Sequence, residues 1–183
     1  MKSAFRLAAV AVLIVLTVTL QISVFDHFTL RGVVPDVALL VVIAAAIVRG
    51  ANYAALVGFA AGLVLDLAPP ADHTAGRWAL SLVLVGYLTG LVRQETEQGH
   101  DDVSVVGTLV MVAAGAFIGT SIFALTGLVL QDPGVTVGSA LEVVPTAVAY
   151  DLILTPLVLP LVLLLFKRLE PIDRWETAWK SRR

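Results

Sequence analysis

The chain has 183 residues, of which 58% are hydrophobic and only 14% are charged, and its formal net charge is −2. A soluble domain carries roughly 25% charged residues, so this composition excludes an ordinary soluble protein and indicates a membrane protein. The chain contains no cysteine, which excludes a disulfide framework, a thiolate metal site and a cysteine nucleophile.

Six apolar segments predict an all-α bundle of six membrane-spanning helices, forming one domain over residues 1–166. The predicted spans are about 4–24, 34–48, 53–67, 78–92, 103–130 and 146–166. The first would be about 31 Å long as a helix, enough for one crossing. The fifth is long for one crossing, so we expect it to tilt, kink or run past the bilayer. Pro156 and Pro160 predict kinks in the sixth.

The basic residues predict that both termini are cytoplasmic. If the N-terminus is cytoplasmic, only Arg31 and Arg77 of the 12 Lys and Arg residues fall on the other side, as the positive-inside rule requires. Lys2 and Arg6 precede the first apolar run, as they would in a signal peptide. This run is long for a signal peptide and lacks a convincing small-residue cleavage site, so we expect a retained first helix.

The stretch GFAAGLVLD places Gly58, Gly62 and Asp66 on one helical face, four residues apart. Small residues let another helix approach closely, so this face points toward protein. A carboxylate at the C-terminal end of a helix is mildly unfavourable, so Asp66 calls for a partner. The next helix begins near Gly76 and Arg77, and we expect Asp66 to reach either Arg77 or the exposed amides of that helix.

Two further carboxyl groups lie within or beside apolar segments. Asp36 follows Pro35 at the start of the second span, where a carboxylate favourably meets the positive end of the helix dipole. Asp151 lies inside the sixth span, where an ionisable group costs roughly 2.5–3.5 kcal/mol and needs a partner or water. A transport site and a structural hydrogen bond between helices are both open. Because no second acid or base is evident at that depth, the hydrogen bond is favoured.

Three pairs of glycines are spaced four residues apart: Gly58 and Gly62, Gly86 and Gly90, and Gly115 and Gly119. Packing within the bundle is the simplest interpretation of most of them. The fifth span is overlong and carries large apolar residues around its pair. We therefore expect Gly115 and Gly119 to offer a groove to the single span of a partner protein.

No sequence motif indicates catalysis, a cofactor or a metal ion, so the chain is predicted not to be an enzyme. His73 lies close in sequence to Asp66, Asp72 and Arg77. An acid–base or metal site in this loop is one alternative, and a solvated polar turn is the preferred one. Nothing in the sequence suggests a nucleic-acid partner.

Residues 167–183 form a basic tail after the last span. Ile172, Trp175 and Trp179 share one helical face among basic residues. This pattern is typical of a short amphipathic helix that lies in the headgroup layer of the cytoplasmic leaflet and binds membrane lipid. A disordered basic tail is the alternative.

Several stretches taken in order resemble the rod shape-determining MreD family across nearly the whole chain. They are LQISVFDHF, GVVPDVALLVV, GFAAGLVLDLAPPADHTAGRWALSLVLVGYLTG and YDLILTPLVLPLV. The resemblance implies a six-helix bundle similar to the substrate-binding subunits of energy-coupling-factor transporters, in the bacterial cell membrane. It also implies a place in the cell-elongation machinery, beside the bitopic protein MreC, the actin-like protein MreB, and the glycosyltransferase and transpeptidase that build lateral peptidoglycan. The family brings no established catalytic residues.

The sequence leaves two functions open. The first is a non-enzymatic scaffold or regulator that binds an MreC-like partner and supports lateral peptidoglycan synthesis and cell shape. The second is a small-molecule carrier, which would need polar groups converging on a pocket. Asp66, Asp151 and Tyr150 are among the few residues able to line one, so the scaffold is favoured.

Overall fold

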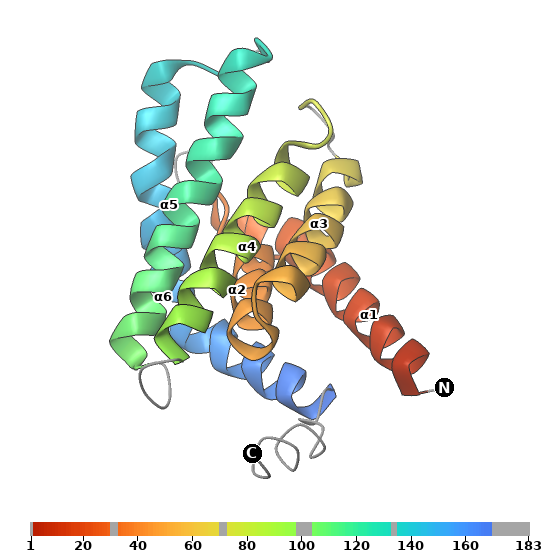
Figure 1. The fold of residues 1–183 in the computed structure, drawn as a ribbon. Helices are drawn as coiled ribbons and strands as arrows, with labels where there is room; N and C mark the ends of the chain where they lie inside the picture. The colour runs from red at the N-terminus through yellow and green to blue at the C-terminus, as the bar shows by residue number, and fades with distance from the viewer. Residues whose placement is uncertain (1, 30–32, 70–72, 98–103, 133–134, 170–183) are drawn as a thin grey trace.

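The computed structural model describes residues 2–29, 33–69, 73–97, 104–132 and 135–169, and this part of the chain is all-α (Figure 1). The helices in chain order are α1 (Lys2–Ser23), the 3-10 turn η1 (Phe25–Phe28), α2 (Val37–Arg49), α3 (Ala51–Leu67), α4 (Arg77–Glu97), α5 (Val105–Val129) and α6 (Val137–Leu169). The tail with Ile172, Trp175 and Trp179 lies outside the described residues, so its surface helix stays a prediction.

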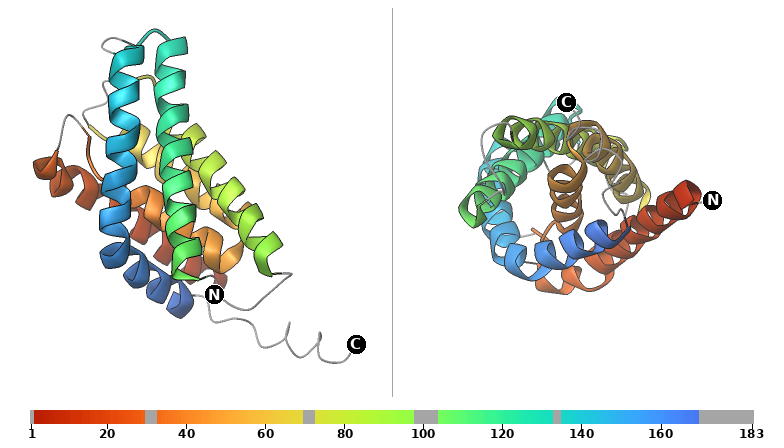
Figure 2. Two further views of the ribbon diagram at one scale, coloured as in Figure 1. Left: turned by 90° about the vertical axis from the view of Figure 1, so that its left-hand side faces the viewer. Right: turned by 60° about the horizontal axis from the view of Figure 1, so that its bottom comes forward.

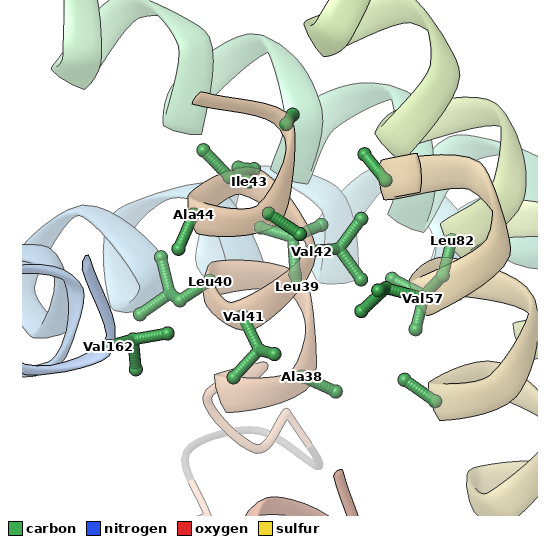
Figure 3. Close-up of a cluster of buried hydrophobic side chains, with 14 of the residues drawn as sticks. Ala38, Leu39, Leu40, Val41, Val42, Ile43, Ala44, Val57, Leu82 and Val162 are labelled. Carbon is green, nitrogen blue, oxygen red and sulfur yellow. The ribbon is translucent and has the colours of Figure 1, made fainter. Parts of the chain in front are cut away.

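The α2 helix is the centre of the bundle, and it contacts each of the other five α-helices (Figure 2). Every residue from Val37 to Ala46 is buried. These residues are apolar on all sides, as expected for a helix surrounded by protein. Their side chains meet Val57 of α3, Leu82 of α4 and Val162 of α6 in one core (Figure 3).

Within the described part of the chain, three helices are long and apolar enough to cross a membrane: Ala4–Ser23, Val105–Val129 and Val137–Leu169. The α2 and α3 helices are apolar but shorter. As a helix of 13 residues, α2 is about 20 Å long, less than the roughly 30 Å hydrocarbon core, so its flanking residues would have to complete a crossing. The chain is a membrane protein, and the count of six spans remains a prediction.

The start of α6 differs from the sequence-based boundary. The sequence predicts a span from residue 146, whereas α6 begins at Val137 and contains Pro145. Thr136 and Ser139 start the helix early because they cap it reciprocally: the Thr136 hydroxyl accepts from the Ser139 amide at 3.1 Å, and the Ser139 hydroxyl accepts from the Thr136 amide at 2.9 Å. The helix therefore begins before the predicted sixth span, and the start of that span stays a prediction.

The C-terminal part of α6 contains Pro156 and Pro160, and the ribbon changes direction there (Figure 1). Each proline lacks the N–H that would bond one turn back, which permits such bends. The helix continues to Leu169, slightly past the predicted end of the domain.

The α3 and α4 helices form the closest helix pair in the bundle, because glycines face backbone on both sides. Gly58 and Gly62 of α3 and Gly86 and Gly90 of α4 lie in this interface. A Cβ on any of them would overlap with backbone atoms of the facing helix. The facing pairs are Gly58 with Leu82, Gly62 with Ala79, Gly86 with Ala54, and Gly90 with Ala51. Two of the three glycine pairs in the sequence thus belong to one antiparallel interface, where small residues permit tight packing.

We expect Gly62→Ala to destabilise the isolated protein by about 1–3 kcal/mol, since the added methyl group must push α3 away from α4. The measurement is thermal or denaturant unfolding of the purified protein in detergent. Gly138→Ala is a matched control, because a Cβ there meets only Thr136 Oγ1, at 3.9 Å. Equal stability of the two variants would contradict the tight interface.

Candidate functional site

The buried N-terminus of α2 is capped by side chains from three helices. The Asp36 carboxylate accepts a hydrogen bond from the Leu39 amide at 2.9 Å. Gln21 of α1 accepts one from the Ala38 amide at 2.9 Å, and Asp151 of α6 accepts one from the Asp36 amide at 2.8 Å. The first amides of a helix have no partner within the helix. Here water is excluded, so α1 and α6 supply the missing acceptors.

This cap explains why Asp151 lies so deep in α6. Its side chain is 1% exposed, and its carboxylate joins α6 to α2, which is the structural hydrogen bond between helices that the sequence favours. The expectation that no second acid lies at its depth is wrong, because α2 begins inside the bundle and brings Asp36 next to it. Of the other polar neighbours, Thr155 donates to the Asp151 carbonyl at 2.6 Å, whereas Tyr150 donates to the Phe28 carbonyl at 2.7 Å.

A second cap lies at the N-terminus of α4. Asp66, at the end of α3, accepts hydrogen bonds from the Trp78 amide at 3.1 Å and from the Ala79 amide at 3.0 Å. Its side chain is buried, at the end of the glycine face formed by Gly58 and Gly62. The sequence left two partners open for Asp66, namely Arg77 or the first amides of the next helix, and the structure shows the amides. The negative charge is therefore placed at the positive end of the α4 dipole.

Arg77 has a different set of partners, which the sequence reasoning missed. Its guanidinium donates to the Phe123 carbonyl of α5 at 2.7 Å, lies 3.8 Å from the centre of the Phe123 ring and forms an ion pair with Asp132. Asp132 follows α5 and also accepts from the Thr74 hydroxyl at 2.8 Å. The sequence contains one indication of this pair: Asp132 follows the fifth predicted span and so lies on the same predicted side of the membrane as Arg77. The buried arginine thus ties α4 to the α5–α6 turn.

The remaining sequence-predicted residues have structural places. Gly76 has a φ of +99° in the turn before α4, a conformation that glycine adopts without strain. Pro35 is buried immediately before the α2 cap. His73 lies with its Nδ1 3.8 Å from Asp66. Among the described residues, no group of three His, Cys, Asp or Glu side chains could hold a metal ion.

Gly115 and Gly119 do not lie on an outer face of α5. A Cβ on Gly115 would meet Ile43 at 3.1 Å and Val85 at 3.2 Å, and one on Gly119 would meet Val85 at 3.1 Å. The pair therefore packs against α2 and α4 inside the bundle. The expectation that it offers a groove to a partner's helix is wrong, because α2 already occupies the space beside it.

The outer side of the α5–α6 hairpin does carry an apolar groove of about 350 Å³. Its walls include Phe117, Ser121 and Leu125 of α5 and Ala140, Leu141 and Pro145 of α6. The early start of α6 creates this groove, because the residues before Pro145 form one of its walls. It lies on the opposite side of α5 from the internal glycine pair.

The fold and the two carboxylate caps define an all-α membrane protein whose buried polar groups bind its own helix ends. A family model described as rod shape-determining protein MreD matches residues 1–168, and the chain belongs to this family. The family is one of shape-determining proteins that work in the rod-shape complex, which implies protein partners. No curated protein and no solved structure matches the chain, so the expected similarity to energy-coupling-factor subunits is not supported.

We expect Asp151→Leu to destabilise the bundle by about 1–3 kcal/mol, because the Asp36 amide would be left buried without an acceptor. Asp151→Asn should cost much less, since its amide oxygen can accept the same hydrogen bond. Unfolding in detergent measures both, with Ile153→Leu as a control at a position 72% exposed on the same helix. If Asn were as damaging as Leu, the hydrogen bond would not be the stabilising element.

Acid should loosen the link between α4 and the α5–α6 turn. The pKa of Asp132 lies below its ordinary value, chiefly because the Thr74 hydroxyl donates a hydrogen bond to the carboxylate, with a further contribution from the positive charge of Arg77. Its stabilising effect is therefore complete above the ordinary aspartate pKa of about 3.9 and disappears as the pH falls through the lower folded-state value.

The test compares the unfolding temperatures of wild type and Asp132→Asn from neutral to acidic pH. Wild type should be the more stable protein at neutral pH, and the difference should vanish at the acidic end. Glu142→Gln, an exposed change on α6, is the control. A difference that is independent of pH would show that the charge of Asp132 does not contribute.

Proposed function

We propose that this protein is a non-enzymatic scaffold of the bacterial cell-elongation complex, a multi-pass protein of the cell membrane with both termini in the cytoplasm. It binds the single membrane span of an MreC-like bitopic protein. Through that partner it supports the lateral peptidoglycan synthesis carried out by a glycosyltransferase and a transpeptidase. MreB filaments are indirect partners in the same machinery. Membership of the shape-determining family supports this role.

The observation that carries the proposal is the use of the buried carboxylates. A carrier needs polar groups that point into a pocket and meet a substrate. Asp66 instead binds the first amides of α4, and Asp151 binds the first amide of the α2 cap. Tyr150 binds the Phe28 carbonyl. The residues best suited to a carrier are therefore engaged in holding the bundle together, which favours the scaffold.

The α5–α6 groove is the surface that we assign to the partner's span. Helices associate in a membrane through close packing rather than through the hydrophobic effect, so a preformed groove with small residues is favourable. Ser121 and Ala140 supply small side chains, and Phe117 and Leu125 supply apolar area. This surface replaces the internal Gly115 and Gly119 pair as the proposed contact on the fifth helix.

The height of the hairpin also suits a partner that continues outside the membrane. The 33 residues of α6 span about 50 Å as a helix, well beyond the roughly 30 Å hydrocarbon core. At the end where α5 joins α6, the hairpin rises past the ends of α3 and α4 (Figure 1). Arg77 and Asp132 tie that end to α4, so the groove is held in a defined position.

We expect Ala140→Trp to reduce capture of the MreC-like partner from the same organism by at least about tenfold, because the indole fills the groove. A loss of about 1.4 kcal/mol of packing free energy corresponds to that factor. The measurement is pull-down from co-expressing membranes, together with the monomer yield of each variant in detergent. Ala60→Trp, in the separate groove between α1 and α3, is the matched control. Equal partner capture by both variants would contradict the assigned surface.

A further inference from the structure

A second apolar groove, of about 260 Å³, lies between α1 and α3. It is lined by residues 7–15 of α1 and 53–64 of α3, and Tyr53 is the one lining residue with a polar side-chain atom. The α1 wall is open to the side: Leu7 and Val15 are more than half exposed. Figure 2 (right) shows the N-terminal part of α1 leaving the ring of helices.

One end of this groove lies next to a cation. The guanidinium of Arg49 lies 5.0 Å from the centre of the Tyr53 ring, which forms that end of the groove. Arg6 directly precedes Leu7, the first lining residue of α1, and is partly exposed. Since α2 returns between them, α1 and α3 both begin at the same end of the bundle (Figure 1). The groove is therefore basic at one end and apolar along the rest of its length.

The length of the apolar part corresponds to one leaflet. Residues 53–64 of α3 extend about 16 Å as a helix, roughly half of the 30 Å hydrocarbon core. A ligand that matches this site has one negatively charged end and an apolar chain about as long as a leaflet is thick. A phospholipid with an anionic headgroup has both.

We propose that the α1–α3 groove binds one acyl chain of an anionic phospholipid, from the leaflet at its basic end, with the phosphate beside Arg49 and Arg6. The chain buries the apolar walls, and the two guanidinium groups attract the headgroup electrostatically. Neither groove has a basic residue in its lining, but Arg49 contacts the Tyr53 ring of the α1–α3 groove. The proposal is independent of partner binding and of which leaflet is cytoplasmic.

The experiment is native mass spectrometry of the purified full-length protein after addition of phosphatidylglycerol or phosphatidylcholine with identical chains. We expect wild type to retain one phosphatidylglycerol molecule in preference to phosphatidylcholine. Ala60→Trp should abolish this retention by filling the groove, whereas Ala140→Trp in the α5–α6 groove should keep it. Arg49→Gln should lower retention of phosphatidylglycerol about fivefold, the contribution expected of one basic residue at a membrane surface.

Two results would overturn the proposal. Equal retention of both lipids by wild type would show that the basic end does not select a headgroup, and unchanged retention by Ala60→Trp would show that the lipid lies elsewhere. If Ala60→Trp fails to give a monodisperse protein, Ala11→Trp fills the groove from its exposed α1 wall. Partner pull-down on the same variants separates this site from the assigned partner surface.

Discussion

The structure depends on one constraint: a helix that begins inside a membrane protein must find acceptors for its first amides. Water cannot provide them there, and each unsatisfied amide is costly. The start of α2 is buried and the start of α4 is partly buried. In each case a carboxylate from another helix accepts amide hydrogen bonds: Asp151 from Asp36 at the α2 cap, and Asp66 from the first amides of α4. Two acidic residues thus help to determine which helices lie side by side.

The same constraint separates the interior of the molecule from its surface. Carboxylates that bind helix ends are engaged inside the bundle, and the outward faces of α1, α5 and α6 are largely apolar. An outer surface of this kind meets lipid or other helices, which is consistent with the proposed scaffold. The two grooves differ chemically, because Arg49 contacts Tyr53 at the end of the α1–α3 groove whereas Ser121 and Pro145 lie in the α5–α6 groove.

Close packing and capping cooperate at the α3–α4 interface. Glycines on both helices let the backbones approach until no Cβ would fit, and Asp66 lies at the end of this contact, where the amides of α4 begin. Neither feature is sufficient alone. Without the glycines, the carboxylate would stand too far from the amides, and without the carboxylate, the start of α4 would be buried with its amides unpaired.

The sequence by itself determined the helical class, the membrane setting, the family and the glycine face that ends at Asp66, because these follow from composition and from spacing along one helix. Only the tertiary structure decided that Asp151 caps α2, that Arg77 pairs with Asp132, and that Gly115 and Gly119 face inward. Each of these depends on which helix lies beside which. Helical periodicity defines the faces of each helix, but all faces of an apolar helix look alike from its sequence, so their neighbours emerge only from the packed bundle.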